Sequence, residues 1–249
     1  MTKLASMHAA QGRWQLACFD LDGTLITGTT ACQHLADTWL GHSTVMAELE
    51  RRYAAFEISN LDVAIADGTY YAGRALADVE RYLASVPRIA GISETLARLN
   101  AVSIPAILCT VGWKLAADCF RRWYGFAAVC GAEMEVDANG ILTGRTPAAF
   151  DAEEKLRFVT SYCTERGIPL SACIAVGDGR SDIPLFRAVG YSIALNATPG
   201  LREVASVSVD SDDLRAILDV IPDLAPTPVA ADGYGLVGRQ PRAVHGRDP

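Results

Sequence analysis

The fold is decided by one stretch near the start of the chain, Trp14-Gln15-Leu16-Ala17-Cys18-Phe19-Asp20-Leu21-Asp22-Gly23-Thr24-Leu25. Residues 14–19 are mostly apolar and run into a glycine turn, which is typical of a buried strand in a parallel sheet. Alternate strand residues point to the same face, so we expect the carboxylates of Asp20 and Asp22 to share one side of the strand tip. Two like charges this close need a cation or a proton between them. Taken alone, the motif is equally compatible with an acidic turn.

Four later segments resemble this strand, and helical patterns separate them. The predicted strands span residues 103–110, 172–176, 191–195 and 205–209, and the predicted helices span residues 92–100, 113–124, 152–166 and 183–189. Strands that alternate with helices predict right-handed crossover units. We therefore predict an α/β fold, a Rossmann-like doubly wound parallel sheet with helices on both faces.

The pattern changes between residues 27 and 87, where no strand-like run occurs. The residues there indicate successive amphipathic helices, with starts near Thr29 and Ser59 and breaks near Gly41 and Gly68. An insertion directly after an acidic loop can form a lid over it. We predict that residues 12–26 and 88–222 form the core domain and that residues 27–87 form an inserted α-helical cap domain.

Two further segments have patterns of their own. Residues 133–146 contain the Asn139-Gly140 turn signal between short strand-like pieces and predict a β-hairpin. Residues 223–249 are rich in Pro, Ala and Gly without a period, so we expect a disordered tail.

The composition restricts the class of protein. Half of the 249 residues are apolar and a fifth are charged, as in ordinary globular enzymes and binding proteins. The net charge of −7, without a basic run, argues against nucleic-acid binding. No stretch is long enough to span a bilayer, and residues 1–11 lack an apolar signal core. The seven cysteines form no close-spaced metal pattern and suggest a reducing compartment. We expect a cytoplasmic protein with no membrane partner; the sequence carries no signal for an oligomeric state.

Polar residues at separate strand tips are expected to meet in one crevice, because ligands bind there in open parallel sheets. The candidates are Asp20, Asp22, Thr110, Asp178 and Asp182, together with Lys155 on the helix before residues 172–176. A carboxylate can attack phosphorus if a cation cancels its repulsion with the phosphate, and Mg²⁺ prefers carboxylate oxygens. A hydroxyl, backbone N–H groups and an ammonium can hold the remaining phosphoryl oxygens. The set is what phosphoryl transfer through an aspartyl-phosphate needs.

These motifs resemble those of the haloacid dehalogenase superfamily phosphatases, in the phosphoserine-phosphatase-like branch with a helical cap. Residues 20–25 match the family's first motif, hhhDxDGT, and residues 177–182 match the fourth, GDGxxD. Thr110 matches the strand-terminal Ser or Thr of the second motif, and Lys155 suits the third. The resemblance covers roughly residues 15–195.

The resemblance implies a role for each matched carboxylate. Asp20 would be the nucleophile, with its other oxygen on Mg²⁺. Asp22 would be the acid and base, and its backbone carbonyl would face the metal. Asp178 would be a metal ligand, and Asp182 would orient the metal's surroundings. The alternative for Asp182 is an N-cap of the next helix, a role that is compatible with the first.

The resemblance also implies how the phosphoryl group is held. Thr110 would donate its hydroxyl, joined by backbone N–H groups such as that of Gly112, and Lys155 would neutralise both the phosphate and Asp20. Two alternatives stay open. Thr110 can be a simple strand cap, and Lys155 can be a solvated partner of Asp151 at helical i,i+4 spacing.

The match departs from the phosphoserine phosphatases near the first and second motifs. Those enzymes usually carry a glutamate nine residues after the nucleophile to hold the substrate's ammonium group, and here that position is Thr29. The usual Ser-Gly-Gly after the second strand is here Thr110-Val111-Gly112-Trp113, so that a bulky indole follows the motif and alters the floor or wall of the site. Both changes disfavour phosphoserine. Arg51, Arg52 or Arg74 of the predicted cap could bind an anionic part of a substrate, although we expect at least two of them to be surface residues.

We therefore expect a Mg²⁺-dependent phosphatase that hydrolyses a small phosphorylated metabolite through an Asp20 phosphoenzyme, and phosphoserine is the disfavoured alternative. Sugar phosphates, nucleoside monophosphates and amino-alcohol phosphates stay open as substrates. One rival is a metal-independent dehalogenase, against which Asp22 argues. The other is a non-catalytic binding or regulatory protein on the same scaffold.

Overall fold

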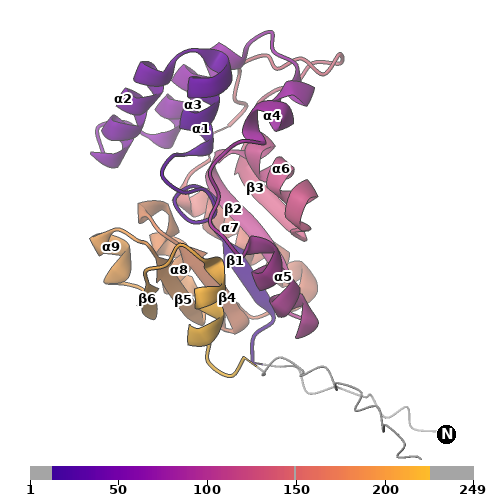
Figure 1. Cartoon of the computed structure of the whole chain (residues 1–249), viewed down its shortest axis with the longest axis vertical. Helices are drawn as coiled ribbons and strands as arrows, with labels where there is room; N and C mark the ends of the chain where they lie inside the picture. The colour runs from indigo at the N-terminus through magenta and orange to yellow at the C-terminus, as the bar shows by residue number, and fades with distance from the viewer. Residues whose placement is uncertain (1–12, 149, 225–249) are drawn as a thin grey trace, which may run out of the picture.

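The architecture is one six-stranded parallel sheet between two layers of helices, with a helical insertion above the carboxyl ends of its strands (Figure 1). The structure, a computed structural model, describes residues 13–148 and 150–224. The strand order is β3-β2-β1-β4-β5-β6, with every neighbouring pair parallel. The predicted fold class is confirmed.

Strand β1 (Leu16–Phe19) is central, and all four of its residues are buried. It pairs with β2 (Ala106–Trp113) on one side and with β4 (Cys173–Gly177) on the other. The sheet continues through β3 (Ala128–Ala132) on one edge and through β5 (Tyr191–Leu195) and β6 (Val207–Val209) on the other. Because the carboxyl ends of β1, β2 and β4 are adjacent, the residues that follow them share one edge of the sheet.

Each face of the sheet has its own apolar core. One face packs against α5 (Ile92–Ala101) and α6 (Lys114–Tyr124), with Phe19, Leu108 and Val176 among its buried residues. The other face packs against α7 (Ala152–Arg166), α8 (Ile183–Ala188) and the short α9 (Pro199–Arg202), with Cys18, Ile107 and Ala175 between them. Burial on both faces explains why the strands are continuous apolar runs without alternation.

The insertion between β1 and β2 is helical, as predicted. It contains α1 (Ala31–Leu35), a π-helical turn (Ala36–Leu40), α2 (Ser43–Ala54), α3 (Asn60–Gly68), a 3₁₀ turn (Thr69–Tyr71) and α4 (Leu76–Leu83). Ser59 caps α3 with a reciprocal capping box to Asp62, and Thr30 caps α1. The division into a core domain and a cap domain at residues 27 and 87 stays a prediction.

The predicted hairpin is present as a short antiparallel pairing rather than as two full strands. Val136 bridges Leu142, and Thr143 donates its N–H to the carbonyl of Glu135, around a turn at Gly140 with φ of +77°. Its second half also pairs with the insertion, since Ala75 bridges Ile141. The hairpin therefore connects the core to the helical insertion.

Several boundaries differ from the prediction: β2 begins at Ala106 instead of residue 103, and β6 begins at Val207 instead of residue 205. Strand β2 continues to Trp113 instead of ending at Thr110, with a register shift against β3 after Cys109. Neither β3 nor the 3₁₀ turn at Leu214–Val220 was predicted. Residues 225–249 of the predicted disordered tail, and the N-terminal residues 1–12, lie outside the described part of the chain. Among the described residues no helix has the length and apolar character needed to cross a membrane.

Candidate active site

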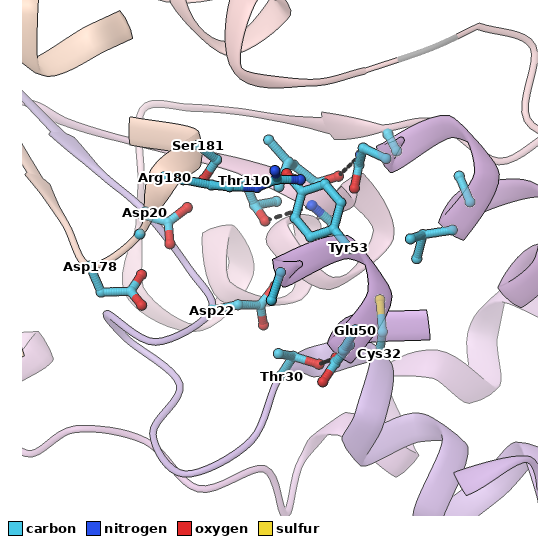
Figure 2. A pocket seen from close by; sticks show the side chains of 18 of the residues that line it. Asp20, Asp22, Thr30, Cys32, Glu50, Tyr53, Thr110, Asp178, Arg180 and Ser181 are labelled. Carbon is cyan, nitrogen blue, oxygen red and sulfur yellow. Dashed lines mark hydrogen bonds between the residues drawn. The ribbon is translucent and has the colours of Figure 1, made fainter. Parts of the chain in front are cut away.

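The predicted carboxylates meet at the carboxyl edge of the sheet. Asp20 directly follows β1, Asp178 directly follows β4, and Asp182 ends the 3₁₀ turn Arg180–Asp182. One oxygen from each lies within 4.8 Å of the others. Figure 2 shows Asp20, Asp22 and Asp178 around a common space. The structure thus brings together residues that are up to 162 positions apart in sequence because the strands that carry them are neighbours.

Lys155 lies beneath this edge with no exposed surface. Its Nζ is 2.6 Å from Asp20 Oδ1 and also donates to Asp182 Oδ1 at 2.5 Å. Burial lowers the pKa of Lys155, but the charges of Asp182 and Asp20 outweigh burial and raise the pKa above its ordinary value. Lys155 is therefore a buried cation shared by two carboxylates. The alternative that it is a solvated partner of Asp151 is wrong, since Asp151 instead caps α7.

Asp182 acts from the next turn. Besides accepting from Lys155, its Oδ2 accepts the N–H of Gly179 at 3.4 Å, inside the fourth motif. It precedes α8 but makes no side-chain cap to that helix. A Cβ on Gly177 would lie 2.2 Å from Asp182 Oδ2, so only glycine leaves room for this carboxylate. Asp182 therefore shapes the motif loop and fixes Lys155.

Asp22 is held apart from this group. Its Oδ1 accepts the backbone N–H of Ala31, at the first residue of α1, with a distance of 2.6 Å. Burial raises the pKa of Asp22 to about 6, against the opposing effects of the Ala31 N–H and the charge of Lys155. A carboxyl group with this pKa can carry a proton near neutral pH and also give it up.

Thr110 and Gly112 lie on β2 beside Asp22. Thr110 is buried, and its Oγ1 accepts the N–H of Gly112 at 2.9 Å. A Cβ on Gly112 would lie 3.0 Å from Asp22 Oδ2 and 3.3 Å from Thr110 Oγ1, so the absence of a side chain keeps the space between them open. Thr110 is not a strand cap, because the strand continues past it.

The carboxylate oxygens of Asp20, Asp178 and Asp182 are suited to a hard divalent cation. Burial, and then the charge of Asp182, raise the pKa of Asp178 to about 7. The oxygens of Asp20, Asp178 and Asp182 lie close enough together to hold one cation. A Cβ on Gly23 would lie 2.2 Å from Asp178 Oδ2, so a side chain at position 23 would clash with the Asp178 carboxylate. Clustered carboxylate oxygens are the ligands that Mg²⁺ prefers.

The site opens into a cavity of about 590 Å³ between the sheet edge and the helical insertion. The floor carries Asp20, Asp22, Thr110, Gly112 and Asp178, and the insertion contributes Met46, Glu50, Tyr53, Phe56, Val63 and Asp67. Glu50, Tyr53 and Arg180 were not singled out from the sequence. The helical spacing of Met46, Glu50 and Tyr53 puts them on one face of α2 and was the available signal.

The two insertion carboxylates in the cavity differ in their partners. Asp67 is fully buried and uses both oxygens, one 2.6 Å from His42 Nε2 and one accepting from Trp113 Nε1 at 2.6 Å. Glu50 accepts the Thr30 hydroxyl, a contact that Figure 2 shows close to Cys32. Burial raises the pKa of Glu50. Within the described residues, Glu50 has no cationic partner, so it is available to one.

The cap arginines considered from the sequence do not line the cavity. Arg51 pairs with Glu48 and Glu57, Arg52 also contacts Glu57, and Arg74 lies over the Trp39 ring. Their partners are on the insertion itself. This arrangement agrees with the expectation that at least two of these arginines are surface residues, and none of the three lines the cavity.

The fold and the carboxylate cluster define a Rossmann-like α/β enzyme core with an inserted helical cap. The sequence pattern of the family described as haloacid dehalogenase-like hydrolase matches residues 17–187. The chain therefore belongs to this family of hydrolases.

Named relatives and solved structures agree with the family assignment. Phosphoserine phosphatase SerB2 of Mycobacterium tuberculosis is 28% identical over 206 residues, which cover 82% of this chain and 49% of the relative. The phosphoserine phosphatase of Archaeoglobus fulgidus is 26% identical and covers 83% of this chain and 60% of its own length. The chain thus spans about half of the length of the curated relatives it matches.

The structural similarity extends over most of the chain. A phosphoserine phosphatase with an analogue of the phospho-aspartyl intermediate has a TM-score of 0.72 and 23% identity, covering 84% of this chain and 99% of that one. A HAD family hydrolase from Salmonella enterica serovar Typhi has a TM-score of 0.76 and 19% identity, covering 84% and 71%. At these identities the likeness concerns the fold.

The buried position of Lys155 leads to a stability prediction. In a metal-free buffer, Lys155→Ala should lower the free energy of unfolding by about 3–5 kcal/mol, because it leaves two buried carboxylates without their cation. Urea denaturation measures the change. The control is Lys114→Ala, which removes a surface pair with Asp118 and should cost less than about 1 kcal/mol. Equal effects of the two substitutions would contradict the buried triad.

Proposed function

We propose that this protein is a Mg²⁺-dependent phosphatase that hydrolyses a small phosphomonoester through an aspartyl-phosphate on Asp20. The observation that carries the proposal is the convergence of Asp20, Asp22, Thr110, Lys155 and Asp178 around the floor of one capped cavity. Membership of a hydrolase family whose matched relatives are named phosphatases supports it.

In the first step an oxygen of Asp20 attacks phosphorus, and the bond from phosphorus to the leaving oxygen breaks. Lys155 already donates to Asp20 Oδ1, so the other oxygen of this carboxylate is the one free to attack. Asp22 transfers its proton to the leaving oxygen, and the alcohol departs neutral. The N–H of Gly112 already donates to Thr110 Oγ1, which leaves the hydroxyl proton of Thr110 for a phosphoryl oxygen.

In the second step water attacks the phosphorus of the Asp20 phosphoenzyme. Asp22, now a carboxylate, takes a proton from that water, and the bond between phosphorus and Asp20 breaks to release inorganic phosphate. The N–H of Ala31 holds Asp22 in place for both steps. The insertion excludes bulk water from the cavity during the reaction.

Asp20 and Asp178 would hold Mg²⁺, with the backbone carbonyl of Asp22, and Asp182 would support them through Lys155 and the motif loop. When bound, Mg²⁺ supplies positive charge that screens the phosphoryl group from the carboxylates.

The substrate that the comparisons favour is phosphoserine, the alternative that the sequence disfavoured because Thr29 replaces a glutamate. The structure supplies a physical reason to accept it. Glu50 on α2 brings a carboxylate into the same cavity, where an ammonium group is its natural partner. On this proposal Glu50 takes the place of the glutamate that position 29 lacks, and Trp113 remains a difference from the phosphoserine phosphatases.

Phosphate release from phosphoserine, tested with Mg²⁺ and with a chelator, separates this proposal from its rivals. We expect release with Mg²⁺ and its loss with the chelator, because the carboxylates then repel the substrate. Activity that survives the chelator on a haloacid would indicate a metal-independent dehalogenase. No release from any phosphomonoester, with the protein folded, would favour a non-catalytic binding protein.

Asp20→Asn and Asp22→Asn should separate the two carboxylate roles. The first should reduce turnover by at least about 10³-fold and prevent the phosphoenzyme, because an amide is not a nucleophile toward phosphorus. The second should slow turnover by roughly 10²- to 10⁴-fold, because the acid and base is lost. Rapid-quench kinetics measure both. Normal turnover in either variant would remove the role assigned to it.

Glu50→Gln should raise KM for phosphoserine by roughly 10- to 100-fold with a smaller change in kcat, because an amide replaces a charged partner of the ammonium group. KM for glycerol phosphate, which has no ammonium, should change little. Glu48→Gln on the exposed side of α2 is the matched control. An unchanged KM for phosphoserine in Glu50→Gln would show that Glu50 does not contact the substrate.

A further inference from the structure

Arg180 is the cationic side chain among the charged residues that line the cavity within residues 13–148 and 150–224. It belongs to the fourth motif, between Asp178 and Asp182, on the 3₁₀ turn after β4. The other charged lining residues are acids, namely Asp20, Asp22, Glu50, Asp67 and Asp178. Lys155 lies beneath the floor, where its ammonium group already donates hydrogen bonds to Asp20 and Asp182. Arg180 is therefore the lining side chain that could form an ion pair with a second anionic group of a substrate.

Two aromatic rings of the cap fix the position of this guanidinium. Arg180 Cζ is 3.8 Å from the centroid of the Tyr53 ring and 4.0 Å from that of Phe56. Figure 2 shows Arg180 extending from the motif loop to the Tyr53 ring. Phe56 lies just past the end of α2 with a φ of +61° and is 76% exposed, so its ring contacts Arg180 at the surface and is not part of the core. The contact joins the cap to the metal-site loop.

Stacking of this kind leaves the hydrogen-bonding edge of the guanidinium unused. Rings contact the faces of the planar group, and its N–H donors point outward in the plane, in a fork that matches a carboxylate. Among the described residues, the contacts of the Arg180 guanidinium are with the Tyr53 and Phe56 rings, and no carboxylate or carbonyl accepts a hydrogen bond from it. A guanidinium that is positioned by stacking and retains its donors is prepared for a ligand.

We infer that Arg180 determines specificity by binding a carboxylate on the leaving group of the substrate, while Tyr53 and Phe56 position its guanidinium. The inference rests on the proposed phosphatase function. Glu50 and Arg180 then face the cavity from the cap and the core respectively, so that a substrate with an ammonium and a carboxylate contacts both parts. Binding of the carboxylate also stabilises the contact between cap and core.

Phosphoserine and phosphoethanolamine provide the test, since they share the phosphoryl and ammonium groups and differ in the carboxylate. The measurement is kcat and KM on both substrates for the wild type, Arg180→Met and Arg180→Lys. Arg180→Met should lower kcat/KM for phosphoserine by roughly 10- to 100-fold, mainly through a higher KM. The same substitution should change kcat/KM for phosphoethanolamine by less than about threefold. Arg180→Lys keeps the positive charge but not the planar guanidinium, so its kcat/KM for phosphoserine should lie between those of the wild type and Arg180→Met.

Arg51→Met is the matched control, because Arg51 lies on α2 but pairs with surface glutamates outside the cavity. This substitution should leave kcat/KM for both substrates unchanged. Equal losses on both substrates in Arg180→Met would overturn the inference and assign Arg180 to the phosphoryl group or to cap packing. A wild type without preference for phosphoserine would also overturn it, while leaving the phosphatase proposal intact.

Hydrolysis of p-nitrophenyl phosphate by the wild type distinguishes failure of the inference from failure of the proposed function. Release from this generic ester with none from phosphoserine or phosphoethanolamine would overturn both the substrate class and the role of Arg180. No release from any of the three would overturn the phosphatase proposal itself.

Discussion

The ammonium of Lys155, buried between Asp20 and Asp182, is the interaction on which the rest of the site depends. Three strand and helix ends carry carboxylates to one edge of the sheet, and without a fixed cation their repulsion would oppose the fold that gathers them. Because α7 anchors Lys155 below that edge, Asp20 and Asp182 stay close to each other and to its ammonium group. The same arrangement leaves one oxygen of Asp20 free toward the cavity, which is what a nucleophile requires.

The helical insertion adds further side chains above this floor. Its α1 orients Asp22 through the N–H of Ala31, its α2 brings Glu50 into the cavity, and its aromatic residues Tyr53 and Phe56 enclose Arg180 of the core. On this account the core performs the phosphoryl chemistry, and the boundary between cap and core identifies the substrate. The buried hydrogen bond from Trp113 of the core to Asp67 of the insertion also joins the two parts.

Much of the fold was predictable because fully buried parallel strands are apolar runs and the helices between them are amphipathic. Strand β3 was missed because Ala128, Gly131 and Ala132 are too small to distinguish a buried strand from a loop. The carboxylates, Thr110 and Lys155 could be named from their motifs. Arg180 and the placement of Glu50 in the site could not, because the cavity that both residues line forms only where the insertion packs over the core. The comparisons favour phosphoserine over the substrates that the sequence preferred, and a comparison of positions 29 and 113 with the family could not include the side chains that line the cavity from other elements.

The central claim is that Asp20 carries the phosphoryl group between the two steps. Rapid acid quenching of the enzyme during turnover of phosphoserine with Mg²⁺, followed by mass spectrometry of the peptides, tests it most directly. The account predicts one added phosphoryl group on the peptide that contains Asp20, and its absence in Asp20→Asn. Steady turnover without any phosphorylated peptide, or a phosphoryl group on a different residue, would contradict it.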